Sequence, residues 1–204
     1  MSEWRELFNG VNLDGWEDFK NPHLWSVEDG TIVGVAELKK MSNLSADAQF
    51  GDFELSLEYN ADPKVNSGVF VRVSDLANEV HTGLEIQILD SYDTETPDKH
   101  DSGALYDMIA PKVNAVRPAG EWNVYRIVCQ GPLLTIDLNG QRTVDANLDD
   151  FHTVGLNPDG TKNKFKHAWK TMPRRGHIGL QTHPGIGKIS GVKIRFRNIR
   201  VREL

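Results

Sequence analysis

Apolar and polar residues alternate with a period of two through much of this chain. From Phe53 to Tyr59 every second residue is apolar, and the segments 133–138 and 192–196 repeat the pattern. Successive side chains of an extended strand point to opposite faces, so this alternation is typical of strands that bury one face. Three further segments are predicted to be strands: 31–35, 124–130 and 176–182.

Turn signals and one break in the alternation indicate how the strands are shaped. Asn139-Gly140 follows an alternating segment and predicts a two-residue hairpin turn. In the last strand the parity changes after Phe196, which predicts a β-bulge near Arg197-Asn198. No long amphipathic helix is predicted, although residues 161–171 could hold one short helical turn.

Many strands, 18 glycines and no regular alternation of strands with helices predict an all-β protein, an antiparallel β-sandwich. At 204 residues it is expected to form one domain over residues 1–204. Two polar connections, 90–102 and 145–172, are too long for simple hairpins and are candidates for the rim of a site. The single cysteine, Cys129, lies within an alternating segment and is interpreted as a small buried side chain, not a nucleophile.

Charge and hydropathy exclude two classes of partner. The formal net charge of −6 argues against a nucleic-acid surface. The densest basic stretch, Lys162 to Lys170, is short and interrupted, and is interpreted as a solvated loop. No apolar run approaches the roughly 20 residues of a membrane span. Residues 1–5 lack the apolar core of a signal peptide, which fits a cytoplasmic protein or an exported one whose leader was removed. Nothing in the sequence specifies an oligomeric state.

Residues 85–90 carry the strongest functional signal. Glu85 and Gln87 share one face of a predicted strand whose other face is apolar, although β-branched or aromatic residues pack better on strands. A solvated strand face is the alternative. Gln181 and His183 share a face in another strand, as Phe70 and Arg72 do in a third. Several strands with such a polar face predict a site for a polar ligand.

The residue types give weaker support to two other kinds of site. The histidines and the single cysteine lack zinc-ligand spacing. The acidic residues of the 90–102 loop could supply oxygen ligands to a hard cation, but they do not match the EF-hand pattern, and a solvated acidic loop is favoured. Trp169 lies in a polar segment and is a candidate for stacking on a sugar ring, against the usual role of tryptophan in packing.

With these pieces placed, the chain resembles the 3-keto-disaccharide hydrolase domain family. The resemblance covers nearly the whole length. Its motifs, in chain order, are Leu7-Phe8-Asn9-Gly10, Leu13-Asp14-Gly15-Trp16, Trp25-Ser26-Val27-Glu28-Asp29-Gly30, Asn66-Ser67-Gly68-Val69-Phe70-Val71-Arg72, Gly83-Leu84-Glu85-Ile86-Gln87-Ile88-Leu89-Asp90, Gly103-Ala104-Leu105-Tyr106, Gly120-Glu121-Trp122-Asn123, Leu138-Asn139-Gly140, Gly179-Leu180-Gln181-Thr182-His183 and Phe196-Arg197-Asn198-Ile199. The resemblance implies a concanavalin A-like jelly roll of two curved antiparallel sheets, with the ligand on the concave face.

The resemblance also implies cleavage of glycosides already oxidised to a ketone at C3 of the sugar. Such a ketone acidifies the C2 proton, so the glycosidic bond can break by elimination, and water can then add. This chemistry needs one general base, a group that stabilises the enolate, and a proton for the leaving oxygen.

The resemblance and the polar strand faces together assign roles to ten residues. Either Glu85 or His183 is expected to be the base. Substrate is expected to contact Asn66, Arg72, Gln87, Asp90, Tyr106, Gln181, Arg197 and Trp169, with Asp90 and Tyr106 at the rim. The sequence identifies no definite cofactor. A divalent cation could bind the enediolate and be ligated by Glu85, Asp90 and His183.

Two alternatives to this enzyme remain. A non-catalytic carbohydrate-binding module is one, because jelly rolls host lectins as readily as hydrolases. A conventional glycosidase is the other, because Glu85, Gln87 and Asp90 have the spacing of the Glu-x-Asp-x-x-Glu motif of sandwich-fold glucanases. The replacement of its middle acid by Gln87 disfavours this option, because retaining enzymes need two carboxyl groups about 5–5.5 Å apart.

Overall fold

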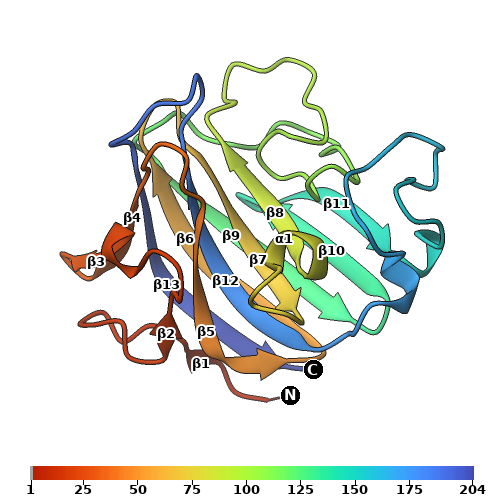
Figure 1. Cartoon of the computed structure of the whole chain (residues 1–204), viewed down its shortest axis with the longest axis horizontal. Helices are drawn as coiled ribbons and strands as arrows, with labels where there is room; N and C mark the ends of the chain where they lie inside the picture. The colour runs from red at the N-terminus through yellow and green to blue at the C-terminus, as the bar shows by residue number, and fades with distance from the viewer. Residues whose placement is uncertain (1) are drawn as a thin grey trace.

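The computed structural model describes residues 2–204 and consists of two antiparallel β-sheets packed face to face (Figure 1). This confirms the all-β sandwich. Within the described residues the larger sheet has eight strands in the order β11 (Gln141–Asn147), β10 (Leu133–Leu138), β9 (Trp122–Gln130), β6 (Phe53–Ala61), β13 (Lys193–Glu203), β4 (Thr31–Val35), β3 (Trp25–Glu28), with β1 (Arg5–Glu6) paired to β13. The smaller sheet has five, in the order β2 (Trp16–Glu17), β5 (Ser42–Phe50), β12 (Gly176–His183), β7 (Asn66–Val73), β8 (Leu84–Leu89).

Helical structure is limited to short turns in the part of the chain that the structure describes: α1 (Glu79–Thr82) and the 3-10 turns η1 (Pro22–Leu24), η2 (Leu148–Asp150) and η3 (Trp169–Thr171). The last of these confirms the short turn expected within residues 161–171. Over residues 2–204, none of these helices has the length and apolar character needed to cross a bilayer.

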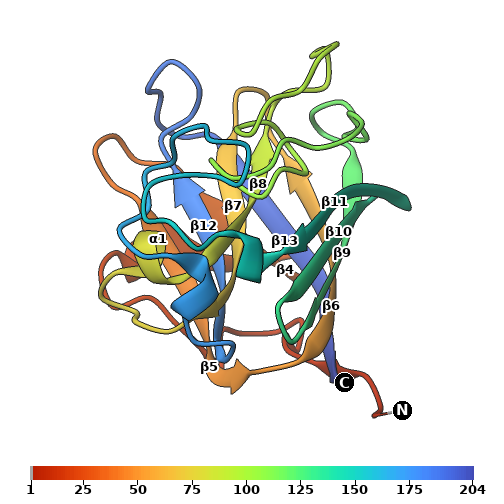
Figure 2. The same cartoon turned by 90° about the vertical axis from the view of Figure 1, so that its right-hand side faces the viewer.

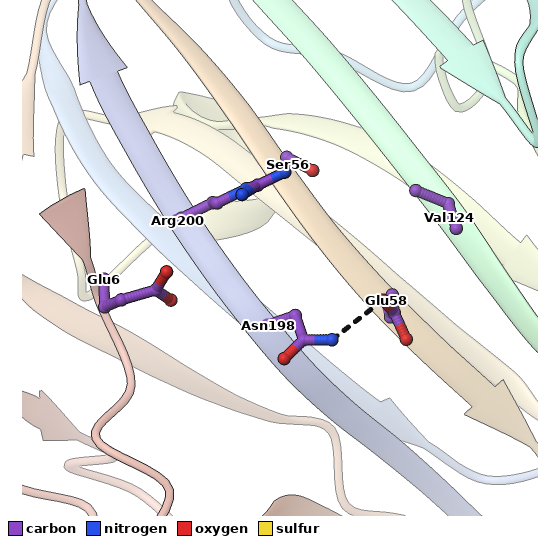
Figure 3. A pocket seen from close by; sticks show the side chains of 6 residues that line it. All are labelled: Glu6, Ser56, Glu58, Val124, Asn198 and Arg200. Carbon is purple, nitrogen blue, oxygen red and sulfur yellow. Dashed lines mark hydrogen bonds between the residues drawn. The ribbon is translucent and has the colours of Figure 1, made fainter. Parts of the chain in front are cut away.

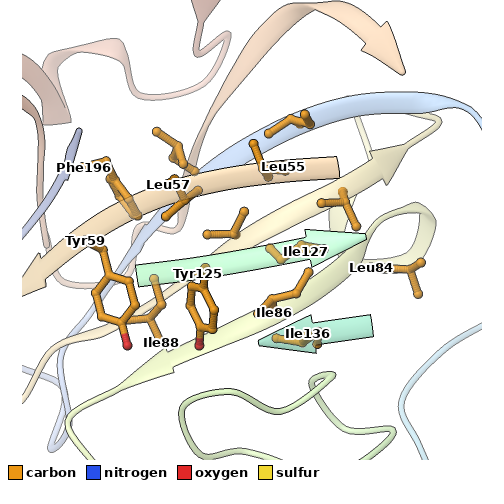
Figure 4. Close-up of a cluster of buried hydrophobic side chains, with 14 of the residues drawn as sticks. Leu55, Leu57, Tyr59, Leu84, Ile86, Ile88, Tyr125, Ile127, Ile136 and Phe196 are labelled. Atoms are coloured by element: carbon orange, nitrogen blue, oxygen red, sulfur yellow. The ribbon is translucent and has the colours of Figure 1, made fainter. Parts of the chain in front are cut away.

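The apolar sides of the alternating strands meet between the two sheets. Leu57 and Tyr59 from β6 are fully buried, and so are Ile86 and Ile88 from β8 in the other sheet (Figure 4). Each Å² of apolar surface buried between the sheets stabilises the fold by about 25 cal/mol, and this burial is the main driving force for packing the sheets together. Cys129 is also fully buried in this core, as expected.

The two predicted irregularities are both present. Asn139 and Gly140 join β10 to β11 with φ angles of 51° and 80°, the left-handed values that the short hairpin turn requires. The register of β13 against β6 shifts between Arg197 and Arg200, which is the predicted bulge, and Asn198 there has a φ of 51°.

Two long connections cover the edge of the smaller sheet near β8. In the segment between β8 and β9, Leu105 pairs with Ile86, and the backbone N–H of Tyr106 donates to the Glu85 carbonyl at 2.9 Å. The segment between β11 and β12 lies beside α1 (Figure 2). These connections bring residues that are distant in sequence onto the outer face of the smaller sheet.

Candidate functional site

A cavity of about 130 Å³ opens on the outer face of the smaller sheet. Six residues proposed from the sequence line it: Asn66, Glu85, Gln87, Tyr106, Gln181 and His183. The polar sides of β7, β8 and β12 therefore meet in one place, because their apolar sides are committed to the core. Met41, Val80 of α1 and Lys164 complete the lining.

Gly68 makes room for the carboxylate at the floor of the cavity. In the sheet Gly68 lies directly between Gln87 of β8 and Gln181 of β12. A Cβ atom at this position would lie only 2.9 Å from Oε1 of Glu85 and 3.1 Å from its Cγ. A larger residue would therefore displace the Glu85 side chain, so the glycine has a steric role in the site.

Glu85 is the only carboxylate in the lining of this cavity. It is 6% exposed, and burial raises its pKa from 4.5 to about 7, against the opposing effects of the Lys164 ammonium and a hydrogen bond with Gln181. A carboxyl group with a pKa near neutrality can exchange a proton with a substrate at physiological pH.

Lys164 also lines the cavity, and the sequence pattern does not indicate it as a site residue. Its Nζ lies 4.0 Å from Oε2 of Glu85 and 4.1 Å from the ring centre of Tyr106. Its backbone N–H donates to Oδ2 of Asp107 at 2.7 Å, which fixes the loop at this point. Burial lowers the pKa of Lys164, although Glu85 and Asp107 oppose the shift. Lys164 is still partly exposed, as expected for the basic stretch, but its ammonium also reaches the cavity.

A chain of polar side chains runs from Gln87 to His183. The Gln87 Nε2 donates to Oδ1 of Asn66 at 3.1 Å, and Nδ2 of Asn66 lies 3.1 Å from Nδ1 of His183. The same Nδ1 lies 2.9 Å from the Pro184 carbonyl, so when Nδ1 is protonated it donates there and Nε2 is the basic nitrogen. Oε1 of Gln87 is buried with no hydrogen-bond partner in the described chain, and a bound polar ligand would satisfy it.

The structure places Arg72 away from this site, and the prediction that it lines the pocket is wrong. Its side chain is 2% exposed and donates to the carbonyls of Gly51 and Gly131 and to the carboxylate of Asp52. The cause is a bulge where β7 pairs with β12, at which Arg72 takes a φ of 54°. The bulge breaks the alternation, so Arg72 does not share the face expected from Phe70.

Three other proposed residues also lie outside the cavity lining: Arg197, Trp169 and Asp90. Arg197 is on the larger sheet, where Nε donates to Glu58 at 2.8 Å and the guanidinium covers the Trp122 ring at 3.8 Å. Trp169 is 3% exposed and packs edge-on against Phe165, so it cannot stack on a sugar at the surface.

Asp90 follows β8, and its Oδ2 accepts from the Lys64 backbone N–H at 2.7 Å. The expected cation ligands Glu85, Asp90 and His183 therefore do not meet at one point. Within residues 2–204, no three His, Cys, Asp or Glu side chains are grouped so that they could hold a metal ion.

A second polar cavity, of about 190 Å³, lies on the outer face of the larger sheet (Figure 3). Its two carboxylates are Glu6 and Glu58. Glu58 accepts from Arg197 and Asn198 at 2.8 Å each, and these hydrogen bonds with the nearby arginines hold its pKa below the ordinary value despite partial burial. A carboxylate held ionised in this way is a poor proton acceptor, so the cavity at Glu85 is the better candidate for chemistry.

Comparisons with known proteins agree with this fold. A family model described as a 3-keto-alpha-glucoside-1,2-lyase-like domain matches residues 3–202. A 3-keto-disaccharide hydrolase of Bacteroides thetaiotaomicron is 25% identical over 233 residues, covering 97% of this chain and 77% of the relative.

Two solved structures with a similar fold differ in how closely they match this chain. A candidate glycosyl hydrolase from Parabacteroides distasonis superposes with a TM-score of 0.84 at 30% identity, over 99% of this chain and 100% of that one. The carbohydrate-binding module CBM66 from Bacillus subtilis superposes with a TM-score of 0.59 at 14% identity, over 93% of this chain and 96% of that one. At that identity the second likeness concerns the fold alone.

Proposed function

The chain belongs to the 3-keto-alpha-glucoside-1,2-lyase-like domain family, and we propose that it cleaves glycosides whose sugar carries a ketone at C3. The observation that carries the proposal is Glu85, a single buried carboxyl group with a pKa of about 7 at the floor of a polar cavity. One base of this kind is what removal of an acidified C–H proton requires.

In the proposed reaction the carboxylate of Glu85 takes the proton from C2 of the sugar. The electrons of the C2–H bond pass to the C3 carbonyl and form an enolate. The enolate then collapses to a C1=C2 double bond while the C1–O bond breaks, and the leaving oxygen takes up a proton. Addition of water across the double bond returns a proton to C2 and places a hydroxyl on C1, so the net result is hydrolysis.

Lys164 and His183 supply the two remaining roles in this proposal. The Lys164 ammonium lies 4.0 Å from the Glu85 carboxylate, close enough to face the charge that develops on a substrate held beside that base. Cationic groups placed at a developing oxyanion lower the barrier most in a site shielded from water. His183 lines the cavity on β12, with β7 between it and β8, and with both ring nitrogens protonated its Nε2–H provides the proton for the leaving oxygen.

The two rival functions are disfavoured by the same carboxyl group. A retaining or inverting glycosidase needs two carboxyl groups at the scissile bond, and Glu85 has no carboxylate partner in the lining of its cavity. A carbohydrate-binding module needs hydrogen-bond donors and acceptors, but it gains nothing from a carboxyl group whose ionisation is opposed by burial.

The test is incubation with an aryl 3-keto-glucoside and with its unoxidised parent glucoside. Release of the aryl alcohol from the keto compound alone supports the proposal. Release from the parent compound indicates a conventional glycosidase, and release from neither with saturable sugar binding indicates a binding module. The Glu85→Gln variant should slow release by roughly 10²–10⁴-fold, whereas the matched control Glu58→Gln, on the opposite sheet, should leave it unchanged.

A further inference from the structure

A larger cavity, of about 460 Å³, adjoins the site at Glu85 and shares two of its wall residues, Met41 and His183. It lies between the segments 36–41 and 184–191. The N–H of Leu38 donates to Oγ of Ser190 at 3.0 Å, and the N–H of Gly191 donates to the Ala36 carbonyl at 2.8 Å. The two segments are therefore joined to each other, and the cavity between them is part of the folded structure.

The lining of this cavity combines apolar and cationic groups. Leu38, Met41 and Pro184 contribute apolar surface, and three lysines surround it: Lys39, Lys40 and Lys188. Lys40 is paired with Glu37 at 2.7 Å. Lys39 and Lys188 are exposed and make no ion pair with any residue from 2 to 204. These two unpaired cationic groups make the surface beside the cavity locally positive, in contrast to the net charge of −6 of the whole chain.

The backbone at both free lysines is also unusual. Lys39 has a φ of 63° and Lys188 a φ of 58°, in the left-handed region that glycine and asparagine adopt more easily. Lys39 is the third residue of a turn closed by the Lys40 N–H and the Glu37 carbonyl at 3.1 Å, a position where glycine is preferred. Residues held in such conformations are found at ligand sites more often than elsewhere, and the pair at one cavity therefore adds to the evidence that it binds a ligand.

We propose that this second cavity receives the leaving group of the substrate and selects one that is apolar next to the glycosidic oxygen and anionic farther out. The inference rests on the proposed function. The sugar occupies the small cavity at Glu85, the glycosidic oxygen passes His183 at the shared wall, and the leaving group lies against Leu38, Met41 and Pro184. Its carboxylate, sulfate or phosphate then meets Lys39 and Lys188.

The experiment compares two 3-keto-glucosides that differ in one charge, those of 4-hydroxybenzoate and 4-hydroxybenzamide. Each is given to the parent, to the double variant Lys39→Asn/Lys188→Asn, and to the charge-matched control Lys112→Asn/Lys170→Asn. Asparagine tolerates the left-handed backbone, so the double variant is expected to fold. Its preference for the anionic substrate, as the ratio of the two kcat/KM values, should fall by roughly threefold to tenfold, because the double variant removes two weak, solvent-exposed ion pairs with the anion.

In the control the ratio should equal that of the parent, and high salt should reduce the parent's preference. Cleavage of both substrates with the same ratio in all three proteins would overturn the inference while leaving the proposed function intact. If neither substrate is cleaved, the proposed function fails and the cavity is still tested by ligand-observed NMR. Binding of 4-hydroxybenzoate over 4-hydroxybenzamide that disappears in the double variant supports the anion site, and equal binding of the two by the parent refutes it.

Discussion

The substitution Glu85→Gln should make the protein more stable while removing its activity. In the folded state the pKa of Glu85 is about 7, against an ordinary value of 4.5, because burial disfavours the charged form. The folded protein therefore binds more protons than the unfolded chain between these pH values, and its stability falls as the pH rises through this window. Below pH 4.5 the carboxyl is neutral in both states, and it contributes no penalty.

The size of the effect follows from the two pKa values. At 1.36 kcal/mol per pH unit, the raised pKa of Glu85 destabilises the fold by about 1 kcal/mol at pH 5, where only the unfolded chain ionises, and by about 3 kcal/mol at pH 8. Glutamine has nearly the same shape and carries no charge, so Glu85→Gln should recover this difference. With a urea m-value of about 2–3 kcal/mol per molar, the unfolding midpoint at pH 8 should rise by about 1 M.

The assay is urea unfolding of parent and variant at several pH values from 5 to 8, with turnover of an aryl 3-keto-glucoside measured on the same preparations. Turnover should fall by roughly 10²–10⁴-fold, the usual contribution of a positioned general base. In the parent, kcat/KM should drop about tenfold per pH unit below 7 as Glu85 is protonated, and the variant should lack this acid limb. A stability difference that is independent of pH, or a variant less stable than the parent at pH 8, would refute the buried-base reasoning.

Three further substitutions test the neighbours of Glu85 and the core. Lys164→Met removes the cation 4.0 Å from Glu85, so the acid limb of the pH profile should move to higher pH and kcat should fall by about 10²–10³-fold; an unmoved limb would contradict the pairing. Gly68→Ala places a methyl group 2.9 Å from Oε1 of Glu85, and should lower kcat at least about tenfold, whereas Gly51→Ala, whose methyl group would meet only the Arg175 side chain at 3.8 Å, should not. Cys129→Ala should lose about 1 kcal/mol of unfolding free energy and keep its turnover per folded molecule, because the thiol is buried and burial raises its pKa to about 12; a large loss of turnover with the fold intact would show otherwise.

The sandwich could be predicted from the sequence because its evidence is local. A strand that buries one face shows this in a period of two, and the turn at Asn139-Gly140 depends on two adjacent residues. The bulge in β13 was also predictable, because apolar residues on both sides of Arg197-Asn198 record the change of parity. The bulge in β7 produces no visible change of parity in the sequence, because Val73 beyond Arg72 is apolar and buried like its neighbours. For this reason the sequence pattern predicts the wrong face for Arg72.

Some residues of the candidate site could likewise be identified from the sequence, and others could not. Glu85 and Gln87 could be identified because each occupies a strand position that packing alone would give to an apolar residue. Lys164 could not, because it reaches the site through a long connection whose path depends on contacts such as that of its N–H with Asp107. The predicted stacking of Trp169 on a sugar was wrong for a related reason. Trp169 lies among polar residues in sequence, but the 3-10 turn that contains it directs the ring against Phe165 in the core.

The energetics of Glu85 give the strongest reason to regard the cavity as catalytic. At pH 8 the ionised carboxylate destabilises the fold by about 3 kcal/mol, a large share of the roughly 5–15 kcal/mol by which folded proteins exceed their unfolded states. A glutamine at this position could still bond to a sugar hydroxyl without that penalty, so a site evolved for binding alone has no use for the acid. A proton acceptor does, because the burial that destabilises the charged form also raises its pKa to the range where a base is most effective. The penalty and the basicity have one physical cause, and the opposed effects expected of Glu85→Gln on stability and turnover follow from it.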